Sequence, residues 1–322
     1  MGRNRESWEL RRRDKISNFK RYGDLLPFYI PAVVFALIFS YLPMAGLVMA
    51  FKKNPNLLGG DSAIQGILDA TWVGLQNFKM IIKNPKFLAA LENTLIISFL
   101  KIAILFPLPI ALAIIISEMQ TRPLKRGLQF VMFLPYLLSW TTIAGIFVSI
   151  LGTQTGVINN VLEALGHERF QFLNNNDFFR GLMLLTSGWK DLGWSAVTYI
   201  AAITALDTNL NDAARIDGAT KWQQIRYITI PSIMPTIASM FILRVGYVMD
   251  AGFEQVFVFY SPFVEQNGNV LGIYTWRLIN ESGLVPQYAL STAVGFFNSA
   301  VALVLVVSMN SILKRYFNRS IW

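Results

Sequence analysis

The stretch LDTNLNDAARIDGATKWQQIRYITIP, residues 206–231, is a polar island between two long apolar runs. A short helix is expected to begin at one of three residues with N-capping side chains, Asp207, Thr208 or Asn209. Gly218 is expected to end this helix, because glycine readily adopts the left-handed conformation that follows many helices. The island therefore predicts a helix followed by a tight turn.

The island continues into a second predicted short helix over residues 222–228, after which Pro231 opens the next apolar run. The first helix carries small and acidic residues, which are Asp212, Ala213, Ala214 and Asp217. Ala214 lies one turn before Gly218 on the same side of the helix. Because small residues allow another protein to approach the backbone closely, the island is predicted to dock into a groove of a partner. The alternative is a helical hairpin that only joins two spans.

The composition indicates an integral membrane protein. Of 322 residues, 54% are hydrophobic and 15% are charged, and the mean hydropathy is +0.45. A soluble domain carries about 25% charged residues, and the apolar blocks of this chain are too long for core helices. The absence of cysteine and the single histidine, His167, exclude disulfides, cysteine metal sites and a histidine cluster. The net charge of +9 is better explained by basic residues beside membrane spans than by nucleic-acid binding.

Six apolar runs are predicted to cross the membrane as helices, which makes the fold all-α. Their approximate bounds are 26–51, 91–117, 127–151, 179–204, 232–260 and 287–313. They form one membrane domain, 26–313, between a basic N-terminal segment, 1–25, and a short tail, 314–322. The basic segment has no clear signal-peptide cleavage site after it, so the first apolar run is expected to remain as a helix.

The basic residues predict the orientation of the spans. Residues 1–25, 118–126, 205–231 and 314–322 together hold 17 Lys and Arg, whereas the three opposite loops hold 7. Because cytoplasmic loops carry the excess of Lys and Arg, both termini and the polar island are predicted to be cytoplasmic.

The sequence contains none of the motifs expected of an enzyme. It has no G-x-x-x-x-G-K-[ST] phosphate loop and no H-E-x-x-H, and no cluster of reactive groups is evident. A catalytic role is therefore not predicted, and energy for transport has to come from a partner or from an ion gradient.

Three basic residues, Lys101, Lys190 and Arg244, are predicted to lie near the middle of the bilayer, about 15–20 Å into their helices. A charge there costs roughly 2.5–3.5 kcal/mol, so each side chain must face protein or water. One interpretation is that each pairs with helix carbonyls or with a carboxylate, for which Asp191 and Asp250 are candidates. The other is a water-filled path that attracts polar or acidic solutes, and three bases against two acids favour an anionic solute.

Other polar and aromatic residues are candidates for the same path. Asp250 and Glu254 are four residues apart and are expected to share a helical face near the outer end of the fifth span, either to receive substrate or to face water. Trp189 and Trp194 are suited to stacking on sugar rings, although packing explains most membrane aromatics. The residues predicted to line a substrate path are Lys101, Trp189, Lys190, Trp194, Arg244, Asp250 and Glu254.

The island resembles the cytoplasmic EAA loop of the permease subunits of bacterial ABC importers. That pattern runs Glu-Ala-Ala, three residues, Gly, nine residues and then Ile-x-Leu-Pro. Here Asp replaces the Glu and Ile replaces the Leu. The matching residues are Asp212, Ala213, Ala214, Gly218, Ile228 and Pro231.

Further stretches resemble the carbohydrate branch of these permeases. They are GLQNF at 74–78, ENTL at 92–95, FLPYLLSW at 133–140 and PSIMPTIASMFILRVGYVMDAGFEQVFVFYSP at 231–262. The last run is similar to the LplB-type permeases, which are associated with uptake of oligosaccharides and polysaccharides. The resemblance covers nearly the whole chain after about residue 24.

This resemblance implies a MetI-like, six-helix permease of a type I ABC importer in a bacterial inner (cytoplasmic) membrane. The implied partners are a second homologous permease, two ATPase subunits, an extracytoplasmic solute-binding protein and a carbohydrate. ATP and magnesium are expected on the ATPase, so no cofactor or metal is expected in this chain. The residues expected to couple to the ATPase are Asp212, Ala213, Ala214, Asp217, Gly218, Ile228 and Pro231.

Two other classes of protein remain as alternatives. An ion-coupled secondary transporter also explains charge inside a bundle of spans, but it does not account for the spacing within the polar island. A membrane enzyme or a passive scaffold is the second alternative, and an enzyme would need a cluster of reactive groups at one interface.

Overall fold

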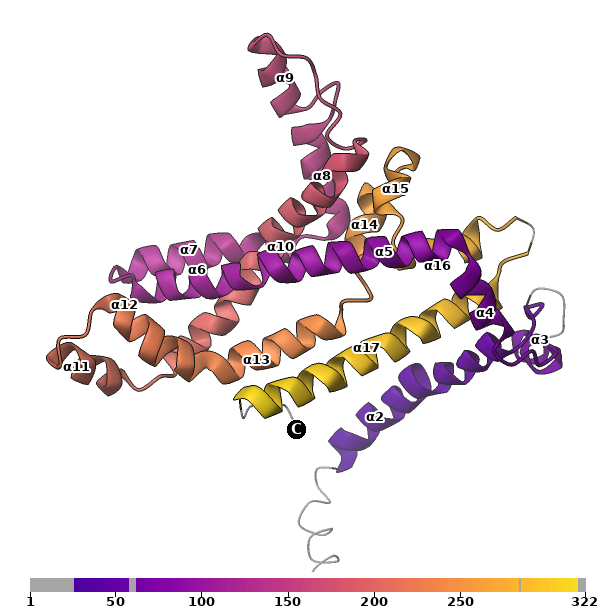
Figure 1. The fold of residues 1–322 in the computed structure, drawn as a ribbon, viewed down its shortest axis with the longest axis horizontal. Coiled ribbons are helices and arrows are strands. Elements are labelled where there is room, and N and C mark those ends of the chain that lie inside the picture. The colour runs from indigo at the N-terminus through magenta and orange to yellow at the C-terminus, as the bar shows by residue number, and fades with distance from the viewer. Residues whose placement is uncertain (1–25, 58–61, 284, 318–322) are drawn as a thin grey trace, which may run out of the picture.

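The computed structural model describes residues 26–57, 62–283 and 285–317, and these residues are mainly helical, with no β-strand. The basic segment 1–25 and the end of the predicted tail, 318–322, lie outside the described residues. Figure 1 shows α11 (Thr208–Ile216) and α12 (Lys221–Gln224) at one end of the long axis and α3 (Ala63–Asp69) and α4 (Gln76–Lys83) at the other. The long helices Pro85–Glu118, Lys221–Gly246 and Tyr288–Phe317 run roughly along that axis, whereas α8 (Trp140–Leu151) and α9 (Val157–Ala164) project away from it.

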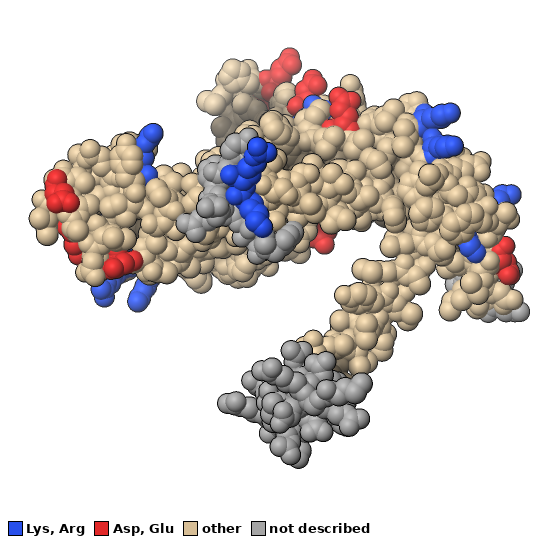
Figure 2. All heavy atoms as spheres, turned by 60° about the horizontal axis from the view of Figure 1, so that its bottom comes forward, with Lys and Arg blue, Asp and Glu red and all other residues tan. Residues whose placement is uncertain are grey.

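The first predicted span is a helical arm that stands away from the other helices. Its segments are α2 (Leu26–Ala36), η2 (Leu37–Tyr41) and η3 (Leu42–Phe51). Of these segments, only η3 packs along α17 (Tyr288–Phe317). Figure 1 shows the start of the arm projecting from the other helices, and Figure 2 shows no charged side chain on the face of the arm that it draws. Its exposed phenylalanines, such as Phe28 and Phe39, suit an environment of lipid or of another protein.

The second predicted span is one helix, Pro85–Glu118, which begins about two turns earlier than expected. Its segments are α5 (Pro85–Leu100), η4 (Lys101–Leu105) and α6 (Pro107–Glu118). The middle segment is a π-helical turn directly before Pro107, which has no N–H group to donate to the preceding turn. Lys101 begins that turn and faces the protein interior.

The third predicted span is bent by 102°. The two arms are α7 (Arg122–Phe133), continued by η5 (Leu134–Leu137), and α8 (Trp140–Leu151). Pro135 lies at the start of the short 3-10 segment, and the Ser139 side chain caps α8 by accepting a hydrogen bond from the Thr142 N–H at 3.1 Å. A single straight helix over 127–151 was therefore the wrong expectation. The short helix α9 (Val157–Ala164) follows.

The fourth predicted span is the central helix of the fold, α10 (Asn176–Thr204). It packs against α6 and also contacts α7, α13 (Ile230–Gly246) and α14 (Phe253–Phe259). Gly193 allows the close approach of α7, because a Cβ built on it would lie 1.9 Å from the carbonyl oxygen of Met132 in that helix.

The polar island folds into α11 (Thr208–Ile216) and the start of a longer helix. That longer helix, Lys221–Gly246, joins α12 (Lys221–Gln224), η6 (Ile225–Thr229) and α13 (Ile230–Gly246) without a break. The expectation of a separate helix over 222–228 was wrong, because Pro231 does not end the helix. The π-helical turn η6 accommodates the missing N–H of this proline.

The fifth predicted span, 232–260, is not one helix. It ends at Gly246, passes through a turn in which Ala251 has φ 52° and Gly252 has φ 79°, and continues as α14 (Phe253–Phe259). The remaining elements before α17 are η7 (Pro262–Val264), α15 (Glu265–Gly268) and α16 (Leu271–Asn280). Left-handed backbone at two successive residues is incompatible with a continuous helix.

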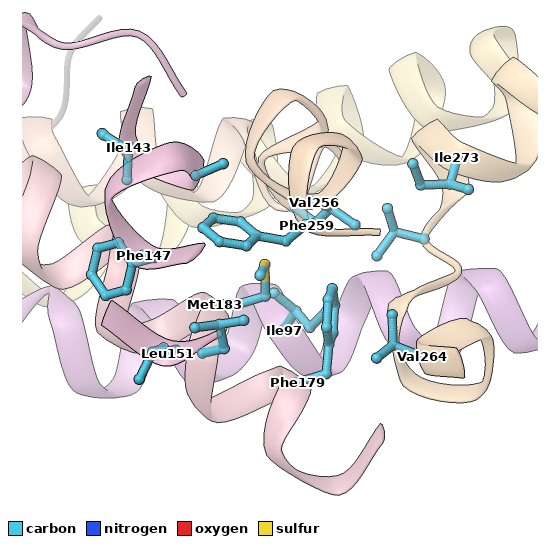
Figure 3. Close-up of a cluster of buried hydrophobic side chains, with 14 residues drawn as sticks. Ile97, Ile143, Phe147, Leu151, Phe179, Met183, Val256, Phe259, Val264 and Ile273 are labelled. Atoms are coloured by element: carbon cyan, nitrogen blue, oxygen red, sulfur yellow. The ribbon is translucent and has the colours of Figure 1, made fainter. Parts of the chain in front are cut away.

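The largest core cluster surrounds this second helix break. Ile97 from α5, Phe147 from α8, Phe179 and Met183 from α10 and Val256 from α14 belong to one buried cluster, which Figure 3 shows. The bent and broken spans therefore pack on each other and on α10 through this cluster.

Among the described residues, four helices are long and apolar enough to cross a membrane, or five if the bent pair is one span. They are Pro27–Phe51, Pro85–Glu118, Lys221–Gly246 and Tyr288–Arg315, with Arg122–Leu137 and Trp140–Leu151 as the bent pair. The 29-residue α10 is not among them, and it carries Lys190 and Asp191 near its middle.

Candidate functional site

Two adjoining cavities lie beside α10 in the middle of the bundle. The larger has a volume of about 440 Å³ and lies between α6, α10 and α13. The smaller, of about 220 Å³, lies against the broken segment that follows α13. Ser187, Asp191, Arg244 and Tyr247 line both cavities, so the two form one polar space.

Lys101 does not form the predicted pair with a carboxylate. Its side chain is buried, and Nζ donates to the carbonyl oxygen of Ala251 at 2.9 Å and to Oε1 of Gln255 at 2.6 Å. Ala251 belongs to the turn that breaks the fifth span, where helical hydrogen bonding is lost. The ammonium group therefore satisfies a carbonyl that the break leaves without a helical partner.

Lys190 likewise donates to backbone carbonyl oxygens at the other helix break, which is the bend in the third span. Its Nζ donates to the carbonyl oxygens of Leu138 and, at 3.1 Å, Tyr136, both of which lie at the bend between η5 and α8. The ammonium group also lies 5.6 Å from the ring centroid of Tyr136 and 5.3 Å from that of Trp140. Both lysines thus pair with carbonyl oxygens, which was one of the two predicted interpretations.

Gln255 is a central polar residue that the sequence reasoning missed. Its side chain is fully buried, and Oε1 accepts from Lys101 and from Oγ of Ser187 at 2.8 Å. Its Nε2 donates to the Met183 carbonyl oxygen at 2.8 Å and to Oγ1 of Thr186 at 2.5 Å. A glutamine within the apolar run FEQVFVF was the available signal, because such a side chain must find hydrogen-bond partners.

Arg244 and Asp191 differ from the two lysines. Both line the two cavities, and the side chain of neither forms a hydrogen bond or an ion pair with any described residue. Arg244 is half-buried on α13, and Asp191 is half-buried on α10. The expectation that Asp191 neutralises a buried lysine through direct contact is therefore wrong, and the cavity holds an opposite pair of charges that do not touch.

Asp250 and Glu254 do not share a helical face, because the break at Ala251 and Gly252 lies between them. Asp250 is exposed and lines the smaller cavity, whereas Glu254 is exposed at the first turn of α14 and lines none of the described cavities. The structure brings Asp250 to the polar space and leaves Glu254 outside it.

The two predicted tryptophans also separate. Trp194 lines the larger cavity and stacks on Tyr136, with ring centroids 4.6 Å apart and an interplanar angle of 5°. Trp189 instead packs edge-on against Phe147, with ring centroids 5.8 Å apart, and it lines neither cavity. Trp194 and Tyr136 thus form a stacked aromatic pair beside the polar space.

The polar island has the local geometry that the sequence predicts. Of the three candidate caps, Asp207 is the N-cap of α11, and it accepts from the Asn209 N–H at 3.0 Å. Gly218 has φ +80° directly after the helix, and the Ala219 N–H donates to the Ala214 carbonyl at 2.8 Å.

Most of the island is exposed. Asp212 forms an exposed ion pair with Arg215 at 3.7 Å, and Ala213 is exposed on the same helix. A groove of about 400 Å³ lies between the end of α11 and the start of the next helix. Of the residues predicted to couple to a partner, those that line this groove are Ala214, Asp217, Gly218 and Ile228. Pro231 is exposed outside it.

Large apolar side chains beside this groove are open to the surroundings. Ile216 is 88% exposed at the end of α11, and Trp222 is 65% exposed at the start of the next helix. Lys221 forms an ion pair with Glu118, which ties this end of the long helix to the end of α6. The groove is thus anchored to the bundle and flanked by unpaired apolar surface.

The opposite end of the molecule is held by local polar contacts. Arg277 of α16 donates to Glu265 at 2.6 Å, to Glu281 at 2.7 Å and to the Tyr260 hydroxyl at 3.2 Å. The hydrogen bond to Glu265 raises the pKa of the Arg277 guanidinium above its ordinary value. This cluster connects α15 and α16 to the end of α14.

The chain is similar to known permeases over most of its length. It is 34% identical over 293 residues to the polygalacturonan/rhamnogalacturonan transport system permease protein YteP of Bacillus subtilis, covering 91% of this chain and 88% of that protein. It is also 34% identical to Protein LplB of Bacillus subtilis, covering 89% and 87%.

Two solved structures have the same fold. One is the bacterial alginate ABC transporter in complex with an alginate pentasaccharide-bound periplasmic protein, with a TM-score of 0.84 and 33% identity, covering 95% of this chain and 99% of that chain. The other is a bacterial ABC transporter involved in the import of the acidic polysaccharide alginate, with a TM-score of 0.83 and 34% identity, covering 94% and 99%.

The family model described as "Binding-protein-dependent transport system inner membrane component" matches residues 106–322. This match includes the bent third span, the central helix, the polar island and the broken fifth span. The predicted MetI-like permease fold is confirmed, as is the resemblance to carbohydrate ABC permeases. The chain belongs to the family of binding-protein-dependent transport system inner membrane components.

Proposed function

We propose that this chain is the permease subunit of a type I importer that moves an acidic oligosaccharide across a bacterial inner membrane. In this proposal a partner ATPase supplies the energy through the polar island, residues 206–231. Both termini and the island face the cytoplasm, as the excess of Lys and Arg on that side predicts. Permease names and the alginate titles of the similar proteins support this class of cargo.

The observation that carries the proposal is the shape of the island. The helix α11 ends at left-handed Gly218, and the groove beside it is lined in part by the small residues Ala214, Gly218 and Ala219 and is flanked by exposed Ile216 and Trp222. Apolar side chains exposed next to a concave surface are typical of a protein contact. The continuous helix Lys221–Gly246 runs from this groove to Arg244 at the polar cavities, so movement of the groove is transmitted directly to the cargo path.

The remaining partners follow from the same proposal. A second homologous permease supplies the other wall of the path, and an extracytoplasmic solute-binding protein delivers the carbohydrate. Two ATPase subunits bind ATP and magnesium, and nucleotide binding there provides the free-energy difference between inward-facing and outward-facing states. This chain needs no cofactor of its own and performs no hydrolysis. An ion-coupled carrier is the alternative, but such a carrier has no ATPase to bind the groove beside α11.

A matched pair of glycine variants tests the coupling role. Gly218→Val and Gly166→Val place the same side chain at φ +80° and φ +81°, and neither added Cβ meets another atom within 4 Å. Each substitution costs roughly 1–2 kcal/mol of backbone strain, so the two variants should be present at similar levels. They differ in position, because Gly166 follows α9 in the predicted outer loop between α9 and α10.

The assay measures ATP hydrolysis and sugar uptake by the complete transporter in proteoliposomes. Gly218→Val should weaken ATPase binding or separate hydrolysis from uptake, with uptake reduced at least severalfold, whereas Gly166→Val should behave like the wild type. If Gly218→Val takes up sugar normally with the ATPase fully bound, the island is not the coupling element.

A further inference from the structure

The three basic residues near the middle of the bundle are not equivalent. Lys101 donates to Ala251 and Gln255, and Lys190 donates to the carbonyls of Tyr136 and Leu138. Each ammonium group is therefore occupied by the backbone at a helix break. Arg244 lines both cavities without such a partner among the described residues, and its guanidinium is available to a ligand.

Asp191 is the acidic counterpart of Arg244 in the same space. It lines both cavities from α10, and it forms no hydrogen bond or ion pair with a described residue. A carboxylate oxygen accepts hydrogen bonds from hydroxyl groups, whereas a guanidinium binds a carboxylate in a bidentate manner. A ligand that carries both a carboxylate and hydroxyl groups satisfies both sides of the cavity.

An aromatic surface completes the cavity. Trp194 and Tyr136 are stacked at 4.6 Å and both line the larger cavity, which Arg244 and Asp191 also line. The Trp194 side chain is 46% exposed, so a face of this pair is open to a ligand. A flat aromatic surface beside a paired donor and acceptor is suited to the apolar face of a sugar ring.

We propose that Arg244 binds the carboxylate of a uronate unit, that Asp191 accepts hydrogen bonds from its hydroxyl groups, and that Trp194 and Tyr136 support its ring. This site rests on the proposed function and specifies which residues recognise an acidic sugar during passage. Lys190, which the sequence places in the same path, is assigned to holding the bend instead of binding cargo.

The test compares each acidic trisaccharide with its methyl ester, which has the same backbone without the charge. The probes are trigalacturonate and an alginate trisaccharide, each with its fully esterified form, and neutral arabinotriose. Uptake by the complete transporter in proteoliposomes is measured for the wild type, Arg244→Gln, Arg244→Lys and the control Arg126→Gln, an exposed arginine on α7 outside the polar island and both cavities. Equal amounts of assembled permease are confirmed for every variant.

The wild type should prefer an acid to its ester, and Arg244→Gln should reduce uptake of the acid roughly 10–100-fold while leaving the ester nearly unchanged, because a charge-assisted hydrogen bond is lost. Uptake of the acid by Arg244→Lys should be intermediate between that of the wild type and that of Arg244→Gln, since lysine keeps the charge but not the bidentate geometry. Arg126→Gln should match the wild type.

The other outcomes separate this site from the proposed function. Equal loss of acid and ester in Arg244→Gln, or no loss at all, overturns the assignment of Arg244. Uptake of arabinotriose with neither acid transported, or with ester favoured over acid, overturns both this site and the acidic cargo of the proposed function, and leaves a permease for neutral saccharides. No uptake of any saccharide by the wild type overturns the proposed function itself.

Discussion

The groove at the polar island and the polar cavities at mid-bundle are built in different ways. At the island, the contacts that form the cap and the turn are short in sequence, such as the Asp207 cap two residues from Asn209 and the left-handed turn at Gly218, and the ion pair between Lys221 and Glu118 is a long-range contact to α6. At the cavities, Lys101 reaches Ala251 across 150 residues and Gln255 across 154.

This difference separates two kinds of polar residue. Exposed polar groups at the island exchange protein partners for water at little cost, so they define local shape more than stability. Buried polar groups at the cavities cannot replace a lost protein partner with water, so each must form its hydrogen bonds within the bundle. Substitutions at mid-bundle should therefore reduce stability most, and substitutions at the island should act mainly on coupling.

The largest effect is expected from Lys101→Met. This change keeps most of the side-chain volume but leaves the Ala251 carbonyl and Gln255 without their donor, and each lost hydrogen bond to a charged group is worth about 1.5–3 kcal/mol. Unfolding of the purified chain in detergent should show a loss of roughly 3–6 kcal/mol in stability. Lys83→Met, at an exposed position on α4, is the matched control and should change stability little. Equal stability of the two variants would show that the Lys101 contacts do not hold the helix break.

An intermediate effect is expected from Gly193→Ala. The added Cβ would lie 1.9 Å from the Met132 carbonyl oxygen, so α7 and α10 must move apart. Overpacking of this kind costs about 1–3 kcal/mol. In the same helix, Gly181→Ala meets no atom within 4 Å and should be neutral or slightly stabilising. Thermal unfolding of the two variants measures the difference, and a Gly193→Ala protein as stable as Gly181→Ala would contradict the close approach of α7.

The smallest effect is expected at the island from Thr220→Val. Thr220 caps α12 through a capping box with Gln223, and loss of such a cap costs about 1 kcal/mol. Hydrogen exchange at the Gln223 amide should accelerate about fivefold, with no change at mid-bundle. Thr208→Val, at an exposed residue whose neighbour Asp207 provides the cap, should leave exchange unchanged. Acceleration that spreads to α10 would mean that the island and the cavities are one cooperative unit.

The helix breaks mark the limit of prediction from the sequence. The apolar runs at 127–151 and 232–260 have the length and composition of straight spans, yet one bends by 102° and the other is interrupted at Ala251 and Gly252. Hydropathy reports only that a segment avoids water. It does not report that Lys190 and Lys101 supply the donors that make broken backbone tolerable inside a bundle.

The residues of the candidate site also differ in whether the sequence could indicate their position. Arg244, Asp250 and Trp194 line the polar space, and each could be selected from the sequence because charge or aromatic character in an apolar run is itself the signal. Their contact with a substrate stays a prediction. No such signal in the sequence shows that Lys190 binds backbone carbonyls whereas the Arg244 side chain faces the cavities. Both are basic residues at similar depth, and only the position of the bend between η5 and α8 distinguishes them.

The sequence by itself determined the membrane class, the approximate positions of the apolar runs, and the cap and turn of the polar island. These features depend on composition or on residues within a few positions of one another, so local chemistry is sufficient. Only the tertiary structure decided where the spans break, which cations the backbone occupies, and that Arg244 and Asp191 face one cavity without touching. Those features depend on contacts between distant segments, whose energies exist only after the helices have packed.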